Sequence, residues 1–313
     1  VMRDPVIYRL CYAEHYKAGK KYKVWPLYDF ESTVEEYLCG VTHVIRSNEF
    51  DTRIELQDYI GLLLNFPKVN YKHYGRFTVK GSTTKGREIR ELINSGAYIG
   101  WDDPRLVTLR ALRRRGIIKE SYYELAKKVG MSKQLTTVDF SVIAAINRNL
   151  LDKRAKRFFA VKEPAVVTVK NIPPSLKAFT LSYHPDEPKG ERKLSVTEQY
   201  YLEKKDNDGI QPGTLARFMD AMNVKKVDDT TYEFVSQDYE SFKRTKGPLI
   251  HFVPKDDHEV KAKVFLPDTK TVDIVAEANI SDLEKGAVIQ FERYAFCRLD
   301  ETGDTPLFWF AHE

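Results

Sequence analysis

The stretch from Val24 to Phe50 constrains the fold of this chain more than any other part of the sequence. A short apolar run at its beginning predicts a strand, and Ser32 with Glu35 forms a capping box that predicts the start of a helix. Gly40 lies where a glycine commonly follows the last turn of a helix, and the apolar residues within 41–45 predict a second strand. A strand, a helix and a strand in this order indicate a parallel α/β unit.

Polar residues follow both predicted strands, at the edge where ligands of parallel α/β sheets bind. Tyr28 and Asp29 follow the first strand, and Arg46 and Glu49 follow the second. An arginine at the end of a strand is usually a solvated charge. Arg46 could also pair with Asp29 or Glu49 and only stabilise the end of the strand. Alternatively, its guanidinium could bind a ligand at this edge.

Residues 80–86 form a polar loop that contains two glycines, and a helix is predicted to begin near Arg87. Such a loop offers what a polyphosphate needs, namely backbone N–H groups, hydroxyls and an ammonium group. The side chains concerned are those of Ser82, Thr83, Thr84 and Lys85. Flexible loops of this composition often bind nothing, so the loop by itself supports a phosphate site only weakly.

A cluster of arginines lies in a predicted helix of the segment 101–116. Asp103 is a suitable N-cap, Pro104 a suitable first residue, and Gly116 a suitable end of this helix. Neighbouring arginines on a helix repel one another unless anions lie nearby. The arginines expected to crowd its surface are Arg110, Arg113, Arg114 and Arg115. They could face solvent only, or they could contact the phosphates of an RNA backbone.

After Phe158 the sequence changes to short alternating apolar runs that are separated by Gly, Pro and Asn turn signals. Strands at this spacing predict antiparallel β-barrels. Residues 214–223 fit a helix or a strand equally, as do residues 4–19 near the N-terminus. The expected fold class is therefore α/β followed by all-β.

Composition limits the class of protein. A chain of 313 residues with 42% hydrophobic content can hold two or three packed domains. Its net charge of +5 permits an RNA partner without requiring one. The three cysteines lack metal-ligand spacing, which indicates free thiols in a reducing compartment, the cytoplasm. The sequence contains neither a transmembrane run nor a signal peptide, and we expect the chain to begin inside a domain.

Several motifs together resemble those of class I glutamyl- and glutaminyl-tRNA synthetases, most closely the archaeal-type glutamyl enzymes. The motifs are MRDPVIYR at 2–9, YDF at 28–30, GVTHVIRSNEF at 40–50, YGRF at 74–77, GSTTKGRE at 81–88, GWDDPRL at 100–106 and LRALRRRGI at 109–117. The His-x-Gly-His signature of the first half of such enzymes is missing from the sequence. The resemblance therefore implies a C-terminal portion, which we expect to be catalytically incomplete by itself.

The resemblance implies three domains. Residues 1–98 would be the second half of a Rossmann-like catalytic domain and carry the ATP loop, and residues 99–160 would be a helical domain that contacts the tRNA stem. Residues 161–313 would form two anticodon-binding β-barrels, with the distal barrel at about 196–286.

The resemblance also implies roles for individual residues. Tyr28 and Arg46 would bind glutamate, and Glu49, Arg76 and Phe77 would bind ATP near its adenosine. Ser82, Thr83, Thr84 and Lys85 would cover the phosphates as catalytic residues. Because the loop departs from the usual Lys-Met-Ser-Lys-Ser signature, either Lys80 or Lys85 could meet the phosphates, and we interpret the similar letters at 130–134 as unrelated. The residues expected to bind tRNA are Arg105, Arg110, Arg113, Arg114, Arg192 and Lys193, and Tyr200, Tyr201, Tyr232 and Phe234 could stack on bases or belong to the core.

The implied reaction is the ATP-dependent attachment of glutamate to tRNA(Glu) through a glutamyl-adenylate, with Mg²⁺ expected and no metal site of the protein's own. Glutaminyl enzymes carry a small residue at the position of Arg46, and this difference favours glutamate, since a guanidinium fork matches a carboxylate. Glutaminyl-tRNA synthetase remains the alternative within the class, and a non-catalytic tRNA-binding module the alternative outside it. We expect a monomer, and charging of tRNA(Gln) stays open.

Overall fold

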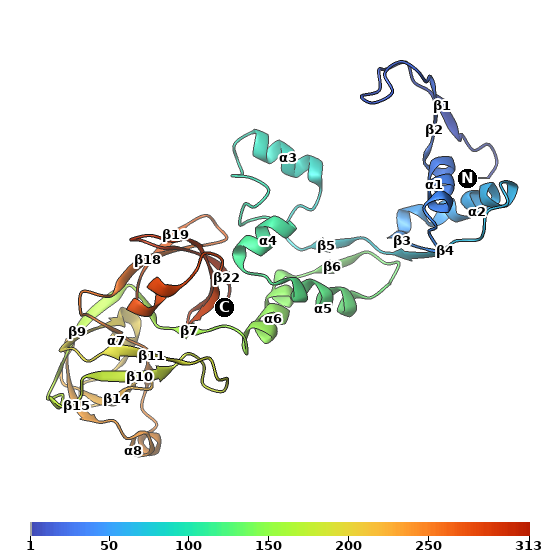
Figure 1. The fold of residues 1–313 in the computed structure, drawn as a ribbon. Helices are drawn as coiled ribbons and strands as arrows, with labels where there is room; N and C mark the ends of the chain where they lie inside the picture. Colours follow the sequence, from blue (N-terminus) through green and yellow to red (C-terminus); the bar gives the residue numbers. More distant parts are fainter. Residues whose placement is uncertain (1) are drawn as a thin grey trace. The chain divides into compact units, whose positions relative to one another are not determined.

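The computed structural model describes residues 2–313 and divides the chain into two compact units, which are considered separately (Figure 1). Unit 1 comprises the chain up to Thr78 together with Ala126–Val138. Unit 2 comprises Val79–Leu125 and Asp139–Glu313. No helix within residues 2–313 is long and apolar enough to cross a lipid bilayer.

Between Tyr8 and Tyr74, unit 1 contains two small sheets, two α-helices and one 3-10 helix. These elements are β1 (Tyr8–Leu10), β2 (Val24–Pro26), α1 (Tyr28–Leu38), β3 (His43–Ser47), the 3-10 helix η1 (Asn48–Arg53), α2 (Ile54–Leu63) and β4 (Asn70–Tyr74). β1 pairs with β2 in an antiparallel hairpin, whereas β3 pairs with β4 in parallel. The prediction of a strand, a helix and a strand was therefore correct in its order, but its two strands belong to different sheets.

The predicted start of the first helix was wrong. α1 begins at Tyr28, immediately after β2, and its N-cap residue Leu27 makes no side-chain capping bond. Ser32 lies buried inside the helix instead of capping it. Gly40 follows the helix with a positive φ of 67°, as predicted.

Two further short strands, β5 (Phe77–Val79) and β6 (Thr136–Val138), pair with each other. Next to them, Gly75 donates a hydrogen bond from its N to Ser132 O at 2.5 Å. A Cβ atom on Gly75 would lie 1.8 Å from the carbonyl oxygen of Gln134, so only glycine fits at this position.

The helices of the middle segment are α3 (Gly86–Asn94), α4 (Leu109–Arg115), α5 (Lys119–Val129) and α6 (Phe140–Leu151). The prediction that Asp103 caps the arginine helix was wrong, because α4 begins at Leu109 and Thr108 Oγ1 accepts a hydrogen bond from Ala111 N. Gly116 ends α4 with a φ of 96°, as predicted. α6 begins after Asp139, which caps it through its side chain.

Two seven-stranded sheets form most of the remaining regular structure described in unit 2. The first has the order β16–β13–β14–β15–β9–β12–β17 and the second the order β7–β20–β21–β22–β18–β19–β8. The strands of the first are β9 (Pro164–Lys170), β12 (Gln199–Glu203), β13 (Leu215–Phe218), β14 (Met222–Lys226), β15 (Thr231–Ser236), β16 (Leu249–Ile250) and β17 (Val253–Pro254). The strands of the second are β7 (Arg157–Phe158), β8 (Ala160–Lys162), β18 (Val260–Phe265), β19 (Thr271–Ala276), β20 (Val288–Phe291), β21 (Ala295–Glu301) and β22 (Leu307–His312).

Both sheets are mixed, so the prediction of purely antiparallel sheets was wrong. β13 with β16, β15 with β9, β18 with β22 and β20 with β7 are parallel pairs. Parallel neighbours need long crossover connections, which periodicity within single strands does not reveal. Pairing among the described strands does not close either sheet into a barrel.

The chain enters the second sheet with β7 and β8, forms the first sheet over 164–254, and returns to the second sheet with β18. The excursion therefore spans 164–254, compared with the 196–286 expected for the distal barrel. An antiparallel hairpin of β10 (Ala178–Ser182) and β11 (Glu191–Ser195) and three short helices, α7 (Lys204–Gly209), α8 (Tyr239–Thr245) and η2 (Ala278–Asp282), accompany the sheets. The ambiguous segment 214–223 forms β13 and the start of β14.

Each sheet has an aromatic core. Phe218 and Phe252 belong to the first core, and Phe291 and Phe308 belong to the second. Two of the tyrosines considered for base stacking, Tyr200 and Tyr232, are fully buried in the first core. Tyr201 and Phe234 are partly buried and pack against the same core. For Tyr200 and Tyr232 the core alternative is therefore the correct one.

Candidate functional site

Arg46, on β3 of unit 1, is buried with 8% of its surface exposed. Its Nε donates a hydrogen bond to His73 Nε2 at 3.0 Å, and its Nη2 donates to Gln57 Oε1 at 2.8 Å. Its Nη1 donates to the hydroxyl of Tyr28 at 3.3 Å. Each nitrogen atom of the guanidinium therefore has an acceptor, but none of these acceptors is a carboxylate.

His73, on β4, does not neutralise this charge. Its Nε2 accepts from Arg46, so its proton lies on Nδ1, which faces Asp51 at 3.3 Å. Burial, followed by the charge of Arg46, lowers the pKa of His73 below its usual value and keeps the imidazole neutral. Asp51 is itself bound by Lys133 Nζ at 2.8 Å, and this hydrogen bond lowers the pKa of Asp51.

Aromatic rings surround the rest of the guanidinium. Its Cζ lies 4.7 Å from the ring centre of Tyr71 and 5.5 Å from that of Phe50. Tyr28 packs against Phe50 at 4.9 Å and is 43% exposed, whereas His73 and Gln57 are buried. The edge of the guanidinium at Tyr28 is therefore the edge nearest to solvent.

Neither carboxylate that the sequence offered to Arg46 pairs with it. Asp29 is bound by Arg53 at 2.7 Å and accepts from Gln57 Nε2 at 3.4 Å. Glu49 lies 3.8 Å from Arg76 instead. Because no ion pair within residues 2–313 includes Arg46, the alternative in which this arginine is neutralised at the strand end by Asp29 or Glu49 was wrong.

The residues predicted near adenosine lie close to one another on the surface of unit 1. Glu49 belongs to η1, Arg76 follows β4, and Phe77 begins β5. The side chains of Arg76 and Glu49 are 53% and 64% exposed, so their ion pair stabilises little by itself. Both side chains remain accessible to a ligand.

The turn 130–134, which we interpreted as unrelated to the ATP loop, packs beside this surface. Asn48 Nδ2 donates to Lys133 O at 2.5 Å, and Lys133 Nζ pairs with Asp51 at 2.8 Å. The backbone of Gly75 also contacts this turn. The only signal in the sequence was the opposite charge of Lys133 and Asp51, which lie 82 residues apart.

The predicted phosphate loop belongs to unit 2 and is described apart from the residues above. Thr83 Oγ1 donates to Glu88 Oε2 at 2.6 Å, and Lys85 Nζ donates to Glu88 Oε1 at 2.8 Å. Both hydrogen bonds lower the pKa of Glu88, and the one from Lys85 has the larger effect. Glu88, on α3, thus holds one side of the loop, while Thr84 and Lys80 are exposed.

Two of the arginines predicted to bind tRNA are engaged within the protein. Arg105 bonds to both carboxylate oxygens of Asp103 and to Ala97 O. Arg114 pairs with Asp300 at 2.7 Å and with Asp102 at 2.8 Å.

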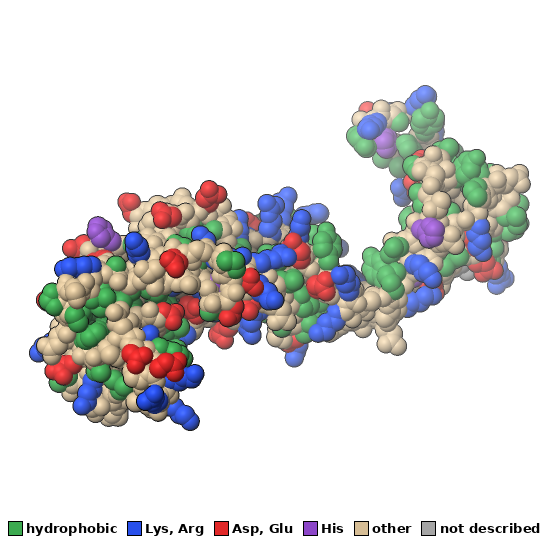
Figure 2. Space-filling view, turned by 60° about the horizontal axis from the view of Figure 1, so that its bottom comes forward, with side chains coloured by type: hydrophobic (Ala, Val, Ile, Leu, Met, Phe, Trp, Pro, Cys, Tyr) green, Lys and Arg blue, Asp and Glu red, His purple; other side chains and the backbone are tan. Residues whose placement is uncertain are grey.

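The remaining basic residues fall into a buried group and an exposed group. Arg192 was predicted to bind tRNA, but it is 4% exposed and its guanidinium pairs with Glu277 at 2.9 Å. Arg110, Arg113 and Lys193 are exposed, whereas Arg115 is buried and bonds only to main-chain carbonyls. On the face drawn in Figure 2, Lys and Arg side chains alternate with Asp and Glu side chains and form no single large basic surface.

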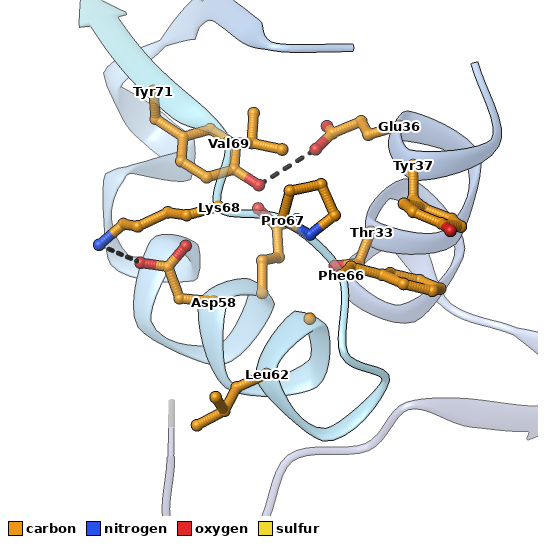
Figure 3. A pocket seen from close by; sticks show the side chains of 12 residues that line it. Thr33, Glu36, Tyr37, Asp58, Leu62, Phe66, Pro67, Lys68, Val69 and Tyr71 are labelled. Atoms are coloured by element: carbon orange, nitrogen blue, oxygen red, sulfur yellow. Dashed lines mark hydrogen bonds and ion pairs between the residues drawn. The ribbon is translucent and has the colours of Figure 1, made fainter. Parts of the chain in front are cut away.

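A pocket of about 260 Å³ lies in unit 1 between α1, α2 and the segment leading to β4 (Figure 3). Tyr71 donates to Glu36 at 3.0 Å across it, and Lys68 pairs with Asp58 at 3.2 Å. Gln57 and Tyr71 line this pocket and also contact Arg46. None of the residues predicted to bind glutamate or ATP lines it.

Three family models match the chain. The catalytic domain of the tRNA synthetases class I (E and Q) matches residues 1–153. Two anti-codon binding domains of the same synthetases match residues 155–239 and 230–300.

The chain is also similar to curated proteins that are named glutamate–tRNA ligase. The chain is 34% identical over 313 residues to the glutamate–tRNA ligase of Methanothermobacter marburgensis, covering 100% of the chain and 55% of the relative. It is 36% identical to the glutamate–tRNA ligase of Pyrococcus abyssi, with 96% and 53% covered, and 35% identical to that of Methanocaldococcus jannaschii, with 96% and 54% covered. The chain thus spans about half the length of the curated relatives it matches.

Proposed function

The chain belongs to the class I tRNA synthetases for glutamate and glutamine, and we propose that it forms part of a glutamate–tRNA ligase. In the proposed reaction, the α-carboxylate of glutamate attacks the α-phosphate of ATP and pyrophosphate leaves. The glutamyl group then passes to the terminal adenosine of tRNA(Glu). Since the chain spans about half of its relatives, the proposal concerns a complete enzyme in which this chain is joined to the remaining part.

The observation that carries the proposal is the burial of Arg46 among neutral partners. A buried charge without a counter-ion is unfavourable, and a carboxylate ligand would relieve this cost. The side-chain carboxylate of glutamate can accept two hydrogen bonds from the guanidinium of Arg46. The side-chain amide of glutamine offers only one acceptor oxygen, and its NH₂ group would turn donors toward the guanidinium. The resulting mismatch costs about 1–3 kcal/mol, which favours glutamate over glutamine.

Tyr28 would assist Arg46 at its edge nearest to solvent. Glu49, Arg76 and Phe77 would bind the adenosine of ATP, and the loop from Ser82 to Lys85 would cover the phosphates. The ion pair of Lys85 with Glu88 is largely exposed, so phosphates could replace Glu88 at small cost. Mg²⁺ would arrive with ATP and offset phosphate charge, and the protein would contribute by positioning and by charge stabilisation.

The RNA partner would extend along the rest of the chain. We propose a catalytic part at 1–98, a helical part at 99–160 that contacts the tRNA stem through Arg110 and Arg113, and anticodon-binding sheets at 161–313. Lys193 is the exposed basic residue that we assign to the anticodon side. The proposed enzyme acts in the cytoplasm as a monomer, and tRNA(Gln) is a second RNA substrate to assay.

Replacement of Arg46 in the complete enzyme tests the proposal. Arg46→Ala should raise the KM for glutamate about 10- to 100-fold, leave the affinity for tRNA unchanged and narrow the preference over glutamine. Arg46→Lys keeps the positive charge but lacks the planar guanidinium, so it should restore only part of the preference for glutamate over glutamine. Aminoacylation assays with both amino acids measure these effects. An unchanged preference, or a loss of thermal stability in proportion to activity, would contradict the proposal.

A further inference from the structure

A concave site in unit 2 is lined only by charged side chains. It has a volume of about 340 Å³ and combines the turn that follows α3, the helix α4 and the strand β21. Its lining residues are Asp102, Arg110, Arg113, Arg114, Arg298 and Asp300. Four arginines thus face two aspartates, and the site has an excess of two positive charges.

The two aspartates are already engaged by two of the arginines. Arg114 lies between them, 2.7 Å from Asp300 and 2.8 Å from Asp102, with its guanidinium 4.1 Å from the ring of Trp309. Arg298 Nη1 pairs with the other oxygen of Asp300 at 3.2 Å. These pairs hold both guanidinium groups in place, and the hydrogen bond to Asp300 is the main cause of the raised pKa of Arg114.

Backbone packing also fixes Arg298. A Cβ atom on Gly286 would lie 3.2 Å from Arg298 Nη2, and one on Gly116 would lie 3.2 Å from Arg298 Cβ. Both glycines have a φ of 96°, which disfavours larger residues at these positions. The side chain of Arg298 is nevertheless 20% exposed, so it can reach a ligand in the site.

Arg110 and Arg113 complete the site from one face of α4, because residues three apart on a helix are neighbours. Both are exposed, and within residues 2–313 the structure gives neither guanidinium a carboxylate partner within 4.0 Å. Two unpaired cations beside two anchored cations repel one another unless an anion lies between them.

We propose that this site binds a single phosphate of an RNA backbone, with Arg298, Arg110 and Arg113 as its direct contacts. Arg114 acts as a positioning residue that holds Asp102 and Asp300 away from the anion. Because no apolar or aromatic side chain of the described residues lines the site, it offers nothing on which a base could stack, which favours a backbone phosphate over a nucleotide. The inference rests on the proposed function and adds Arg298, which the sequence did not single out.

The experiment measures binding of the chain to tRNA(Glu) transcript over a range of salt concentrations. Arg298→Gln should weaken binding about 5- to 10-fold and reduce the slope of log K against log salt by about one, since one phosphate contact is lost. Arg298→Lys should restore the slope but not the full affinity. Lys270→Gln removes a charge from an exposed turn and serves as the matched control.

The thermal midpoint of each variant shows whether it is folded. The double variant Arg110→Gln, Arg113→Gln is a second test of the site, because both residues are exposed and their replacement should not disturb folding. A slope and an affinity unchanged in both Arg298→Gln and the double variant would overturn the phosphate site and leave the proposed function intact. Absence of tRNA binding by the unsubstituted chain would overturn both the phosphate site and the RNA contacts proposed for this chain. A loss of the same size in Lys270→Gln would show a general charge effect and would also overturn the site.

Discussion

Arg46 in unit 1 and Arg192 in unit 2 are both buried arginines on β-strands, and they differ in one respect. Arg192 is 4% exposed and pairs with Glu277, which is itself buried and accepts a hydrogen bond from Phe159 N at 2.8 Å. Arg46 is 8% exposed and has only neutral acceptors. Both guanidinium groups lie over aromatic rings, so packing alone does not distinguish them.

The difference separates a structural charge from one that is available to a ligand. A buried ion pair that connects β11 to the segment before η2 satisfies its own charges and needs no ligand. A buried guanidinium without a carboxylate retains a charge that a ligand can neutralise. The family resemblance implied binding roles for both arginines. Both are buried, and what distinguishes them is whether the buried guanidinium has a carboxylate partner.

The largest expected effect comes from breaking the ion pair in unit 2. Glu277→Gln leaves Arg192 buried without a counter-ion and should lower the free energy of unfolding by about 3–5 kcal/mol. Replacing both partners, with Arg192→Met and Glu277→Leu together, should cost much less because no charge is left unpaired. Chemical denaturation of the chain, followed by tryptophan fluorescence, measures both changes.

The matched substitution in unit 1 is Arg46→Met. It removes a buried cation that has no counter-ion, but it also leaves His73 Nε2 and Gln57 Oε1 without their donor. The free energy of unfolding should therefore fall by about 1–2 kcal/mol, less than in Glu277→Gln. A loss as large as that of Glu277→Gln would break the comparison and make Arg46 a structural residue.

The buried His251 is a third case beside Arg46 and Arg192, because it avoids the cost of a buried charge by staying neutral. Burial, followed by the charge of Arg293, lowers the pKa of His251 from 6.5 to about 4. Its Nε2 donates to Ala160 O at 2.9 Å and its Nδ1 accepts from Arg293 at 3.3 Å. The folded protein therefore binds this proton less tightly than the unfolded chain does.

The consequence is a loss of stability in acid. The contribution is fully present above about pH 6.5 and is lost as the pH falls toward about 4, by up to about 3 kcal/mol. His251→Gln should lack this part of the pH dependence, whereas His258→Gln, at an exposed histidine, should retain it. Denaturant titrations at several pH values measure the difference, and identical pH profiles for the two variants would contradict a neutral buried His251.

The smallest expected effect is at the exposed edge of the Arg46 site. Tyr28→Phe removes one acceptor of Arg46 and, by the proposed function, one contact near glutamate, so the KM for glutamate should rise about 3- to 10-fold, or about 1 kcal/mol. Stability should change by less than about 0.5 kcal/mol, because Tyr28 is half-exposed. Tyr37→Phe, at a similarly exposed tyrosine of α1, should change neither quantity. Equal effects of the two substitutions on KM would exclude a specific role of Tyr28.

Much of the local structure could be predicted from short-range patterns. The strand at β2 and the glycines that follow α1 and α4 could be predicted from periodicity and capping. Errors occurred where a local signal competed with another. Asp103 has the chemistry of an N-cap, but its carboxylate binds Ile99 N and Arg105, and the helix begins five residues after Pro104.

The sequence by itself determined the family, the position of Arg46 at the end of a strand and the polar loop before α3, because motifs and periodicity are local properties of the chain. The tertiary structure decided which charges are free. Arg114 meets Asp300 across 186 residues and Arg192 meets Glu277 across 85 residues, and no local pattern connects such partners. The parallel strand pairs and the burial of Tyr200 and Tyr232 were decided in the same way. The physical reason is that burial and ion pairing depend on which distant segments pack together, whereas propensity and periodicity depend only on neighbours along the chain.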